Sequence, residues 1–302
     1  MSLHRLSSIT MGVPNTAETG AYYTDFGLKP EDDGWFSTQD GGRQLRIVPT
    51  ATRRLVEIVV GVDHPDDLAA VASRLEVPFD GDTLTVHEPV TGMRAVLRVE
   101  PRIEQQAVLA TPYNGPGRQE RAGTRAPGVL REGRVRPRKL GHAVLATTDL
   151  AVTSAFFIKG LGFKASDFIK DAGAFLRCST DHHNILVLRA PVTFLHHTSW
   201  QVDDIDEIGR GAFAMLEDHP ERHVWGLGRH HAGSNFFWYL KDPAGNFSEY
   251  YSDMDCVIDD QLWTPETLEG AKGLFNWGPP PPPSFLHPED LAALMTGAHS
   301  PR

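Results

Sequence analysis

Four short strand-like runs with many apolar residues recur along the chain, and a stretch with helical spacing follows each of them. The strand-like runs lie at 6–11, 55–63, 140–145 and 195–203. The helix-like stretches lie at 17–28, 65–75, 150–163 and 205–216. Short apolar runs are typical of strands, and 3.6-residue spacing is typical of helices. The pattern therefore predicts one unit, made of a strand, a helix and several more strands, that occurs four times.

The two halves of the chain resemble each other, which indicates an internal duplication. The turn at 89–92 in the first half matches Asp-Pro-Ala-Gly at 242–245 in the second. With two units in each half, we expect an N-terminal domain at 1–112 and a C-terminal domain at 138–255. Residues 113–137 form the predicted linker, because this stretch is rich in glycine, proline and basic residues and has no apolar period.

The tail at 256–302 departs from the repeat. Its residues 263–273 and 288–295 predict short helices. Between them, Pro279–Pro283 predicts an extended polyproline stretch, which cannot join the interior of a sheet. We expect the tail to pack over one of the modules.

Composition narrows the classes of partner. The formal net charge of −10 argues against nucleic acid and anionic membranes, and no apolar run approaches the roughly 18 residues that a membrane span needs. The first residues contain no apolar segment typical of a signal peptide. Only Cys178 and Cys256 occur, which favours a reducing, cytoplasmic setting without a disulfide framework.

Histidine stands out, because nine of the 14 histidines lie between His142 and His231. His142 opens one strand-like run, His197 holds the matching place in the next unit, and Glu249 follows the turn at 242–245. Two imidazoles and one carboxylate form the facial triad of non-haem Fe(II) oxygenases, and the same donors suit Mn(II). His196 is the alternative to His197, although matching Leu195 with Leu140 favours His197.

Tyr239 is a further candidate, because Tyr239 and Glu249 each lie five residues from Ala244 in the turn. A hairpin centred on that turn places the two side chains opposite each other on one face. A phenol beside a metal-binding carboxylate can form a hydrogen bond with an oxygen of the substrate. The competing interpretation is an aromatic residue of the core.

The histidines, the glutamate, the Asp-Pro-x-Gly-Asn turn and the fourfold repeat together resemble a two-domain type I extradiol catechol dioxygenase of the vicinal oxygen chelate superfamily. The resemblance extends from Leu6 to about Asp255, and its motifs are specific only in the C-terminal half. It implies an α+β fold of four βαβββ modules, paired into two open-barrel domains. It also implies a reaction in which O2 opens a catechol-type ring beside the hydroxyls, at a mononuclear Fe(II) or Mn(II) site, to a semialdehyde.

The resemblance assigns three catalytic residues. His183 matches the acid–base histidine, with His182 as the alternative, and His230 matches a substrate-binding histidine nine residues before Tyr239, with His231 as the alternative. Aromatic walls are expected from Trp200, Phe247, Trp263 and Phe275. The expected partners are an aromatic diol and O2, together with further copies of the chain in a homo-oligomer.

Two other functions remain open at this point. A glyoxalase-like isomerase or lyase would share the fold and the metal ligands but would have no need of His183, His230 and Tyr239. A drug-sequestering binding protein of the same fold would lack a complete metal triad. In the N-terminal half, Ser8, Glu57 and Val96 take the places of the three ligands, so we expect that half to bind no metal.

Overall fold

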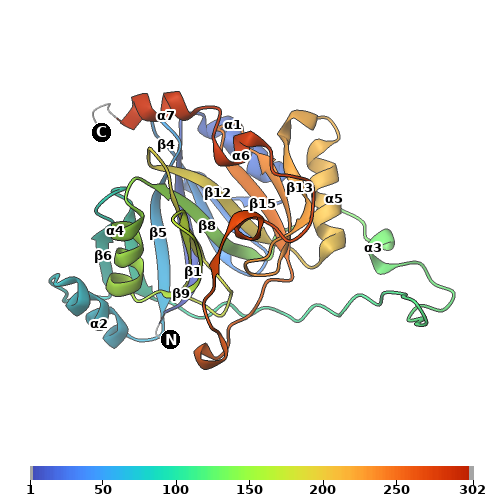
Figure 1. Cartoon of the computed structure of the whole chain (residues 1–302), viewed down its shortest axis with the longest axis horizontal. Coiled ribbons are helices and arrows are strands. Elements are labelled where there is room, and N and C mark those ends of the chain that lie inside the picture. Colours follow the sequence, from blue (N-terminus) through green and yellow to red (C-terminus); the bar gives the residue numbers. More distant parts are fainter. Residues whose placement is uncertain (1–2, 299–302) are drawn as a thin grey trace.

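The chain folds into two β-sheets, one from each half, and the computed structural model describes residues 3–298 (Figure 1). The first sheet has the order β2-β3-β4-β1-β5-β7-β6. Its strands are β1 (Leu3–Val13), β2 (Lys29–Pro30), β3 (Trp35–Thr38), β4 (Gly42–Pro49), β5 (Arg54–Val62), β6 (Thr83–His87) and β7 (Arg94–Val99).

The second sheet has the order β13-β14-β15-β12-β8-β11-β10-β9-β16. Its strands are β8 (Lys139–Thr147), β9 (Lys164–Ile169), β10 (Gly173–Arg177), β11 (Ile185–Arg189), β12 (Phe194–Gln201), β13 (His223–Arg229), β14 (Phe236–Lys241), β15 (Phe247–Ser252) and β16 (Thr267–Leu268). The predicted fourfold repeat is confirmed by the pairing, because the first strand of each module pairs in parallel with the last strand of that module. The four pairs are β1 with β4, β5 with β7, β8 with β11, and β12 with β15. The second module departs from it, since only β6 and β7 follow its helix.

Each module contributes one helix at the predicted place. These helices are α1 (Thr16–Asp25), α2 (Pro65–Leu75), α4 (Leu150–Ala155) and α5 (Ile205–Leu216). Helix α4 continues as a π-helical turn through Leu161, so the predicted stretch is helical almost to its end. In α5 the buried residues Ile208, Ala212 and Met215 recur at helical spacing, and the Asp204 side chain caps its first turn by accepting from the Glu207 N–H.

One continuous hydrophobic core joins the two halves. The Tyr250 ring of β15 stacks on Phe26, just after α1, with centroids 3.9 Å apart, and its hydroxyl donates to the Phe26 carbonyl over 2.6 Å. The adjacent Ser248 hydroxyl lies 2.5 Å from that of Tyr22. The N-terminal half therefore contacts β15 at Ser248 and Tyr250, the two neighbours of Glu249, and stabilises the strand that carries this residue.

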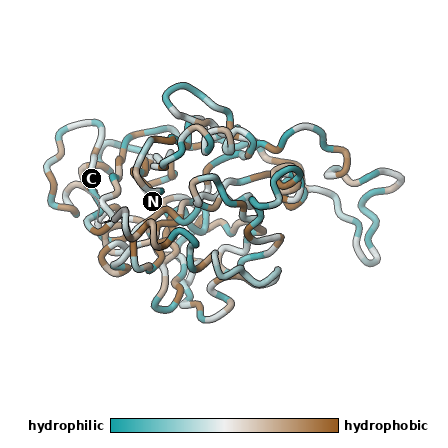
Figure 2. Tube along the Cα trace, turned by 90° about the horizontal axis from the view of Figure 1, so that it is seen from above, coloured by the Kyte–Doolittle hydropathy of each residue, from teal (hydrophilic) through white to brown (hydrophobic). Residues whose placement is uncertain are grey.

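An irregular connection, residues 100–138, links the sheets and contains the predicted linker. It holds only the short helix α3 (Pro127–Leu130), and both views show it projecting beyond the rest of the chain at the right (Figures 1 and 2). The division into domains stays a prediction. Residues 3–298 include no helix with the length and apolarity needed to cross a bilayer.

The tail packs along the second sheet, as Figure 1 shows. The helix predicted at 263–273 is wrong: the segment forms β16, which pairs with β9, and then a 3₁₀ turn at Gly270–Gly273. The edge of the sheet supplies partners for the backbone of this short segment, and that outweighs its weak helical pattern. Beyond the extended prolines lie α6 (Pro283–Leu286) and α7 (Leu291–Ala298).

Candidate metal centre

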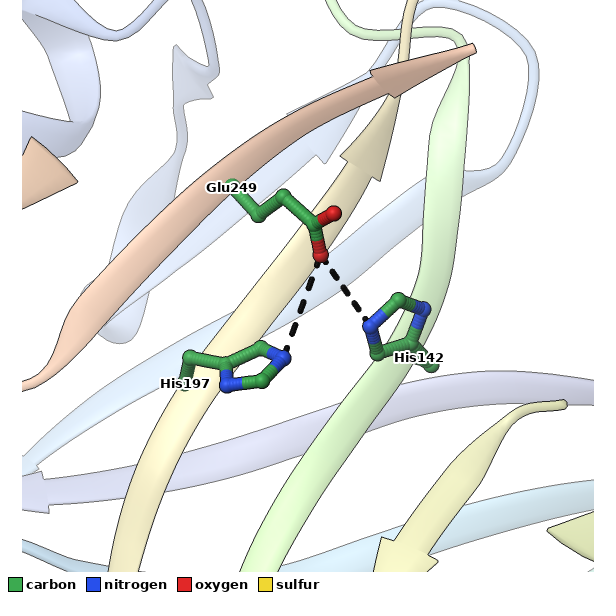
Figure 3. A group of neighbouring side chains, drawn as sticks. All are labelled: His142, His197 and Glu249. Carbon is green, nitrogen blue, oxygen red and sulfur yellow. Dashed lines mark ion pairs between the residues drawn. The ribbon is translucent and has the colours of Figure 1, made fainter. Parts of the chain in front are cut away.

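Three neighbouring strands of the second sheet bring His142, His197 and Glu249 together. They belong to β8, β12 and β15, which lie side by side, and Figure 3 shows their side chains converging. The Nε2 atoms of His142 and His197 lie 3.2 Å and 3.9 Å from Glu249 Oε2. One donor atom from each residue falls within 4.8 Å of the others, which is the spacing that a common metal ion requires.

Glu249 is a buried carboxylate that lacks sufficient partners. Its side chain is fully buried, Oε1 accepts from Asn235 Nδ2 over 3.1 Å, and Oε2 has no hydrogen-bond donor of acceptable geometry despite the nearby His142. Burial alone raises the pKa of this carboxyl, but the imidazoles of His142 and His230 outweigh that effect and hold its pKa below the usual range. A buried anion without full compensation is unstable, so the site fits a divalent cation.

A β-bulge in β12 sets the roles of the histidine doublet at 196–197. The pairing of β12 with β8 shifts between Leu195 and His197, so both imidazoles lie on one side and their Nδ1 atoms are 2.7 Å apart. If His197 presents its Nε2 lone pair to a cation, its Nδ1–H donates a hydrogen bond to His196 Nδ1. The Nε2–H of His196 then donates to the Phe285 carbonyl, 2.6 Å away. His196 thus supports His197 rather than replacing it in the metal group.

Tyr239 lies opposite Glu249 in the β14–β15 hairpin, so the predicted register is confirmed. Its hydroxyl is 2.9 Å from His230 Nε2, and that nitrogen is 3.6 Å from Glu249 Oε1. His230 Nδ1 contacts the Leu274 carbonyl and must donate there, which leaves Nε2 to accept from Tyr239. His231 lies away from this group, with Glu266 Oε2 3.9 Å away as its nearest acidic partner.

The imidazole of His183 packs against that of His142, with ring centroids 4.2 Å apart, and it lines the cavity beside the metal group. Burial, with a smaller contribution from His142, lowers its pKa well below the usual range. A neutral imidazole at this place can accept a proton. His182 is fully buried and does not line the cavity, and its Nδ1 atom contacts His183.

A cavity of about 250 Å³ opens beside the triad. The histidines and Tyr239 form one end of it, and apolar side chains form the rest: Ile169, Ala172, Phe175, Leu186, Leu188, Trp225, Ala232, Leu274, Phe285 and Leu286. The four predicted aromatic walls are wrong, because Trp200 lies in the main core, Trp263 packs on His182, and Phe247 and Phe275 stand behind the cavity wall. A larger hollow of about 800 Å³ lies beside the turn at 242–245, away from the triad.

Comparison with known proteins places this chain in a family. Residues 139–250 match the Glyoxalase/Bleomycin resistance protein/Dioxygenase superfamily. Metapyrocatechase 2 of Cupriavidus necator is 30% identical over 231 residues, which cover 69% of this chain and 72% of that protein. This chain belongs to the extradiol dioxygenases of that superfamily.

Two solved structures agree on the fold. A Mn(II)-bound glyoxalase from Novosphingobium aromaticivorans is 25% identical, with a TM-score of 0.74 and 95% of each chain covered. A variant of homoprotocatechuate 2,3-dioxygenase from B. fuscum is 18% identical, with a TM-score of 0.72 over 94% of this chain and 81% of that one. The expected α+β vicinal oxygen chelate fold is confirmed. The glyoxalase of this pair binds Mn(II), and His142, His197 and Glu249 form a group in this chain that could hold such an ion.

The N-terminal sheet repeats the strands of the site but not its donors. In β5–β7 the pair Val59–Val96 takes the place that Ser199–Glu249 holds in β12–β15, and Glu57 takes the place of His197. Glu57 forms an ion pair with Arg94 and accepts a long hydrogen bond from Thr10. A guanidinium thus meets this carboxylate, and it would repel a divalent cation.

We therefore expect one catalytic metal per chain. Elemental analysis of fully active protein should give one iron or manganese for each polypeptide, and Glu57→Gln should leave that value unchanged. Two tightly held metals per chain, both needed for turnover, would contradict the assignment.

Sequence reasoning missed three groups that touch the site: the Asn235 amide and the carbonyls of Leu274 and Phe285. Backbone carbonyls of the tail leave no signal in side-chain patterns. Asn235 carries a weak signal, since it lies four residues before Tyr239 at the start of the hairpin.

Proposed function

We propose that the chain opens the ring of a catechol-type diol with O2, beside the hydroxyls, at one Fe(II) or Mn(II) held by His142, His197 and Glu249. The observation that carries the proposal is the buried, undercompensated Glu249 carboxylate facing two imidazole nitrogens beneath a cavity of substrate size. The metal, when bound, supplies Lewis acidity and a common site that brings the diol and O2 into contact.

His183, His230 and Tyr239 handle protons around that site. His183 accepts a proton from a hydroxyl of the diol through Nε2, and returns it later in the reaction. Tyr239 and His230 both line the cavity, and the Tyr239 hydroxyl donates to His230. When a diol binds, the Tyr239 hydroxyl can turn from His230 to a substrate oxygen, donate to it, and so stabilise negative charge that develops there. A glyoxalase-type isomerisation would not need this second set of groups.

The cavity favours a diol with an uncharged, apolar substituent. No lysine, arginine, aspartate or glutamate is among the side chains that line it in the described part of the chain. A carboxylate on the substrate would lose its hydration there without gaining a partner. The substrate class we propose is therefore catechol carrying hydrogen, alkyl, halogen or aryl groups.

The expected outcome is that kcat/KM for methyl- or chlorocatechols exceeds that for carboxylated catechols by about 10²-fold or more, since a buried unpaired charge costs several kcal/mol. Initial rates with a matched panel measure this ratio. Leu188→Arg, at the cavity wall, should reduce the ratio of the two kcat/KM values, because the guanidinium can pair with a carboxylate on the substrate. Ile258→Arg, at an exposed position, should leave that ratio unchanged. Equal rates for both classes in the unaltered protein would contradict the proposed substrate class.

The activity itself has a direct test. The protein is loaded anaerobically with Fe(II) or Mn(II), mixed with catechols, and exposed to air while absorbance in the visible range and O2 uptake are recorded. We expect a yellow ring-fission product and one O2 consumed per diol. Conversion of the methylglyoxal–glutathione adduct by the same preparation, with no ring fission of any catechol, would instead favour the glyoxalase-like isomerase.

We also propose that copies of the chain associate and that the protein works in the cytoplasm. Leu109, Val129 and Leu130 on the long connection leave 61–91% of their surface exposed, which favours burial against another copy. The two cysteines are unpaired, as expected in a reducing compartment. Light scattering at working concentration tests the oligomer, and a mass equal to one chain would exclude it.

A further inference from the structure

A chain of hydrogen bonds runs behind His183, away from the cavity. His183 Nδ1 lies 3.0 Å from His182 Nδ1, and His182 Nε2 lies 3.0 Å from Asp167 Oδ2. All three side chains are buried, with exposed fractions of 4%, 0% and 5%. Asp167 is on β9, and its other oxygen, Oδ1, accepts from the Glu266 N–H over 2.8 Å.

With Asp167 ionised and His182 neutral, the direction of every hydrogen bond in this chain is fixed. An ionised carboxylate only accepts, so His182 must donate to Asp167 through Nε2. A neutral His182 then has only a lone pair at Nδ1, and His183 must donate to it through Nδ1. The result is that His183 keeps a lone pair on Nε2, the nitrogen left for the cavity.

The surroundings hold this arrangement in place. His182 is packed against the rings of Phe175 and Trp263, with centroids 5.8 Å and 5.1 Å away, and its backbone N–H donates to the Asp255 carbonyl over 2.9 Å. Gly233 approaches the ring so closely that an added Cβ would lie 3.2 Å from Nδ1. His182 therefore has little freedom to turn and break the contact with His183.

We propose that Asp167 and His182 are positioning residues that hold His183 in the tautomer with a free Nε2 lone pair, ready to take a proton from the diol. The proposal rests on the proposed function of His183 as the acid–base group. A third group that orients a catalytic imidazole is a general device of proton transfer, and it commonly fixes which nitrogen carries the hydrogen.

The structure offers a variant that would reverse the tautomer with almost no change in the size or shape of a side chain. In Asp167→Asn, the amide oxygen should stay on the Glu266 N–H, because that donor has no other partner among the hydrogen bonds of the described residues. The amide NH2 would then face His182 Nε2 and donate to it. His182 would carry its proton on Nδ1 and donate to His183 Nδ1, so the proton of His183 would move to Nε2.

We expect Asp167→Asn to lower kcat by about 10²-fold while KM for the catechol and the metal content stay close to those of the unaltered protein. His182→Gln should retain more activity than His182→Phe, because an amide can accept from His183 and donate to Asp167, whereas a phenyl ring can do neither. His231→Phe is the matched control, because His231 lies beside Glu266, which also contacts Asp167, but His231 takes no part in the chain of hydrogen bonds.

A second measurement does not depend on turnover. Nitrogen-15 spectra of the full chain loaded with diamagnetic Zn(II) distinguish protonated from bare ring nitrogens, and His183→Gln identifies the signals of that residue. We expect a bare Nε2 on His183 in the unaltered protein and a protonated Nε2 in Asp167→Asn. An unchanged tautomer, or a kcat that stays unchanged when the tautomer reverses, would overturn the proposal. If no catechol is cleaved by the unaltered protein, the spectra still test the tautomer while the function itself fails.

Discussion

Glu249→Gln should abolish metal binding and ring cleavage together. The substitution keeps the shape of the side chain but removes the only negative charge in the group, and two neutral imidazoles bind Fe(II) weakly without it. Even loss of a residue behind the ligands costs about 10- to 100-fold in metal affinity, so loss of a ligand should cost on the order of 10²-fold or more. Elemental analysis after dialysis and the ring-fission assay measure both effects.

The histidine doublet supplies the matched control. His197→Ala should lose the metal as Glu249→Gln does. His196→Ala should bind it about 10- to 100-fold more weakly but recover activity with excess metal, because His196 only orients His197. Folding of each variant is checked by its thermal unfolding without metal. Full metal content in His197→Ala together with loss in His196→Ala would exchange the two assignments.

The sequence predicts those parts of the fold that depend on local geometry. Helices α2 and α5 have the predicted bounds, because their apolar spacing and their capping residues lie within a dozen positions. The Tyr239–Glu249 pairing follows from a tight turn and the strict alternation of strands. The match of Glu57 with His197 and of Val96 with Glu249 follows from repeated strand lengths.

Features that depend on contacts between distant segments could not be predicted in the same way. The bulge that turns His196 and His197 to one side is a shift in the pairing of β12 with β8, and alternation alone would have placed these neighbours on opposite faces. The partners of His196 and His230 are carbonyls of the tail, 89 and 44 residues away along the chain. The tail also supplies Leu274, Phe285 and Leu286 to the cavity in place of the expected aromatic walls.

His183→Phe should separate chemistry from binding. The phenyl ring fills nearly the same space, so its contacts with His142 and Phe175 should persist, at the centroid distances of 4.2 Å and 5.0 Å that the imidazole has. It has no nitrogen to take the hydroxyl proton, so kcat should fall by about 10²-fold or more. Metal content and the dissociation constant of a catechol under anaerobic conditions should change little.

This result would identify His183 as the proton acceptor, because the Nε2 atoms of the other histidines at that end of the cavity already have partners. His142 and His197 direct Nε2 toward Glu249, and His230 Nε2 accepts from Tyr239. In the proposed mechanism, only His183 has a nitrogen left for the diol. Loss of metal in His183→Phe would make His183 a ligand and refute this division of roles. A normal kcat would show that the proton leaves by another route, and His230 would then be the first group to test, by His230→Phe.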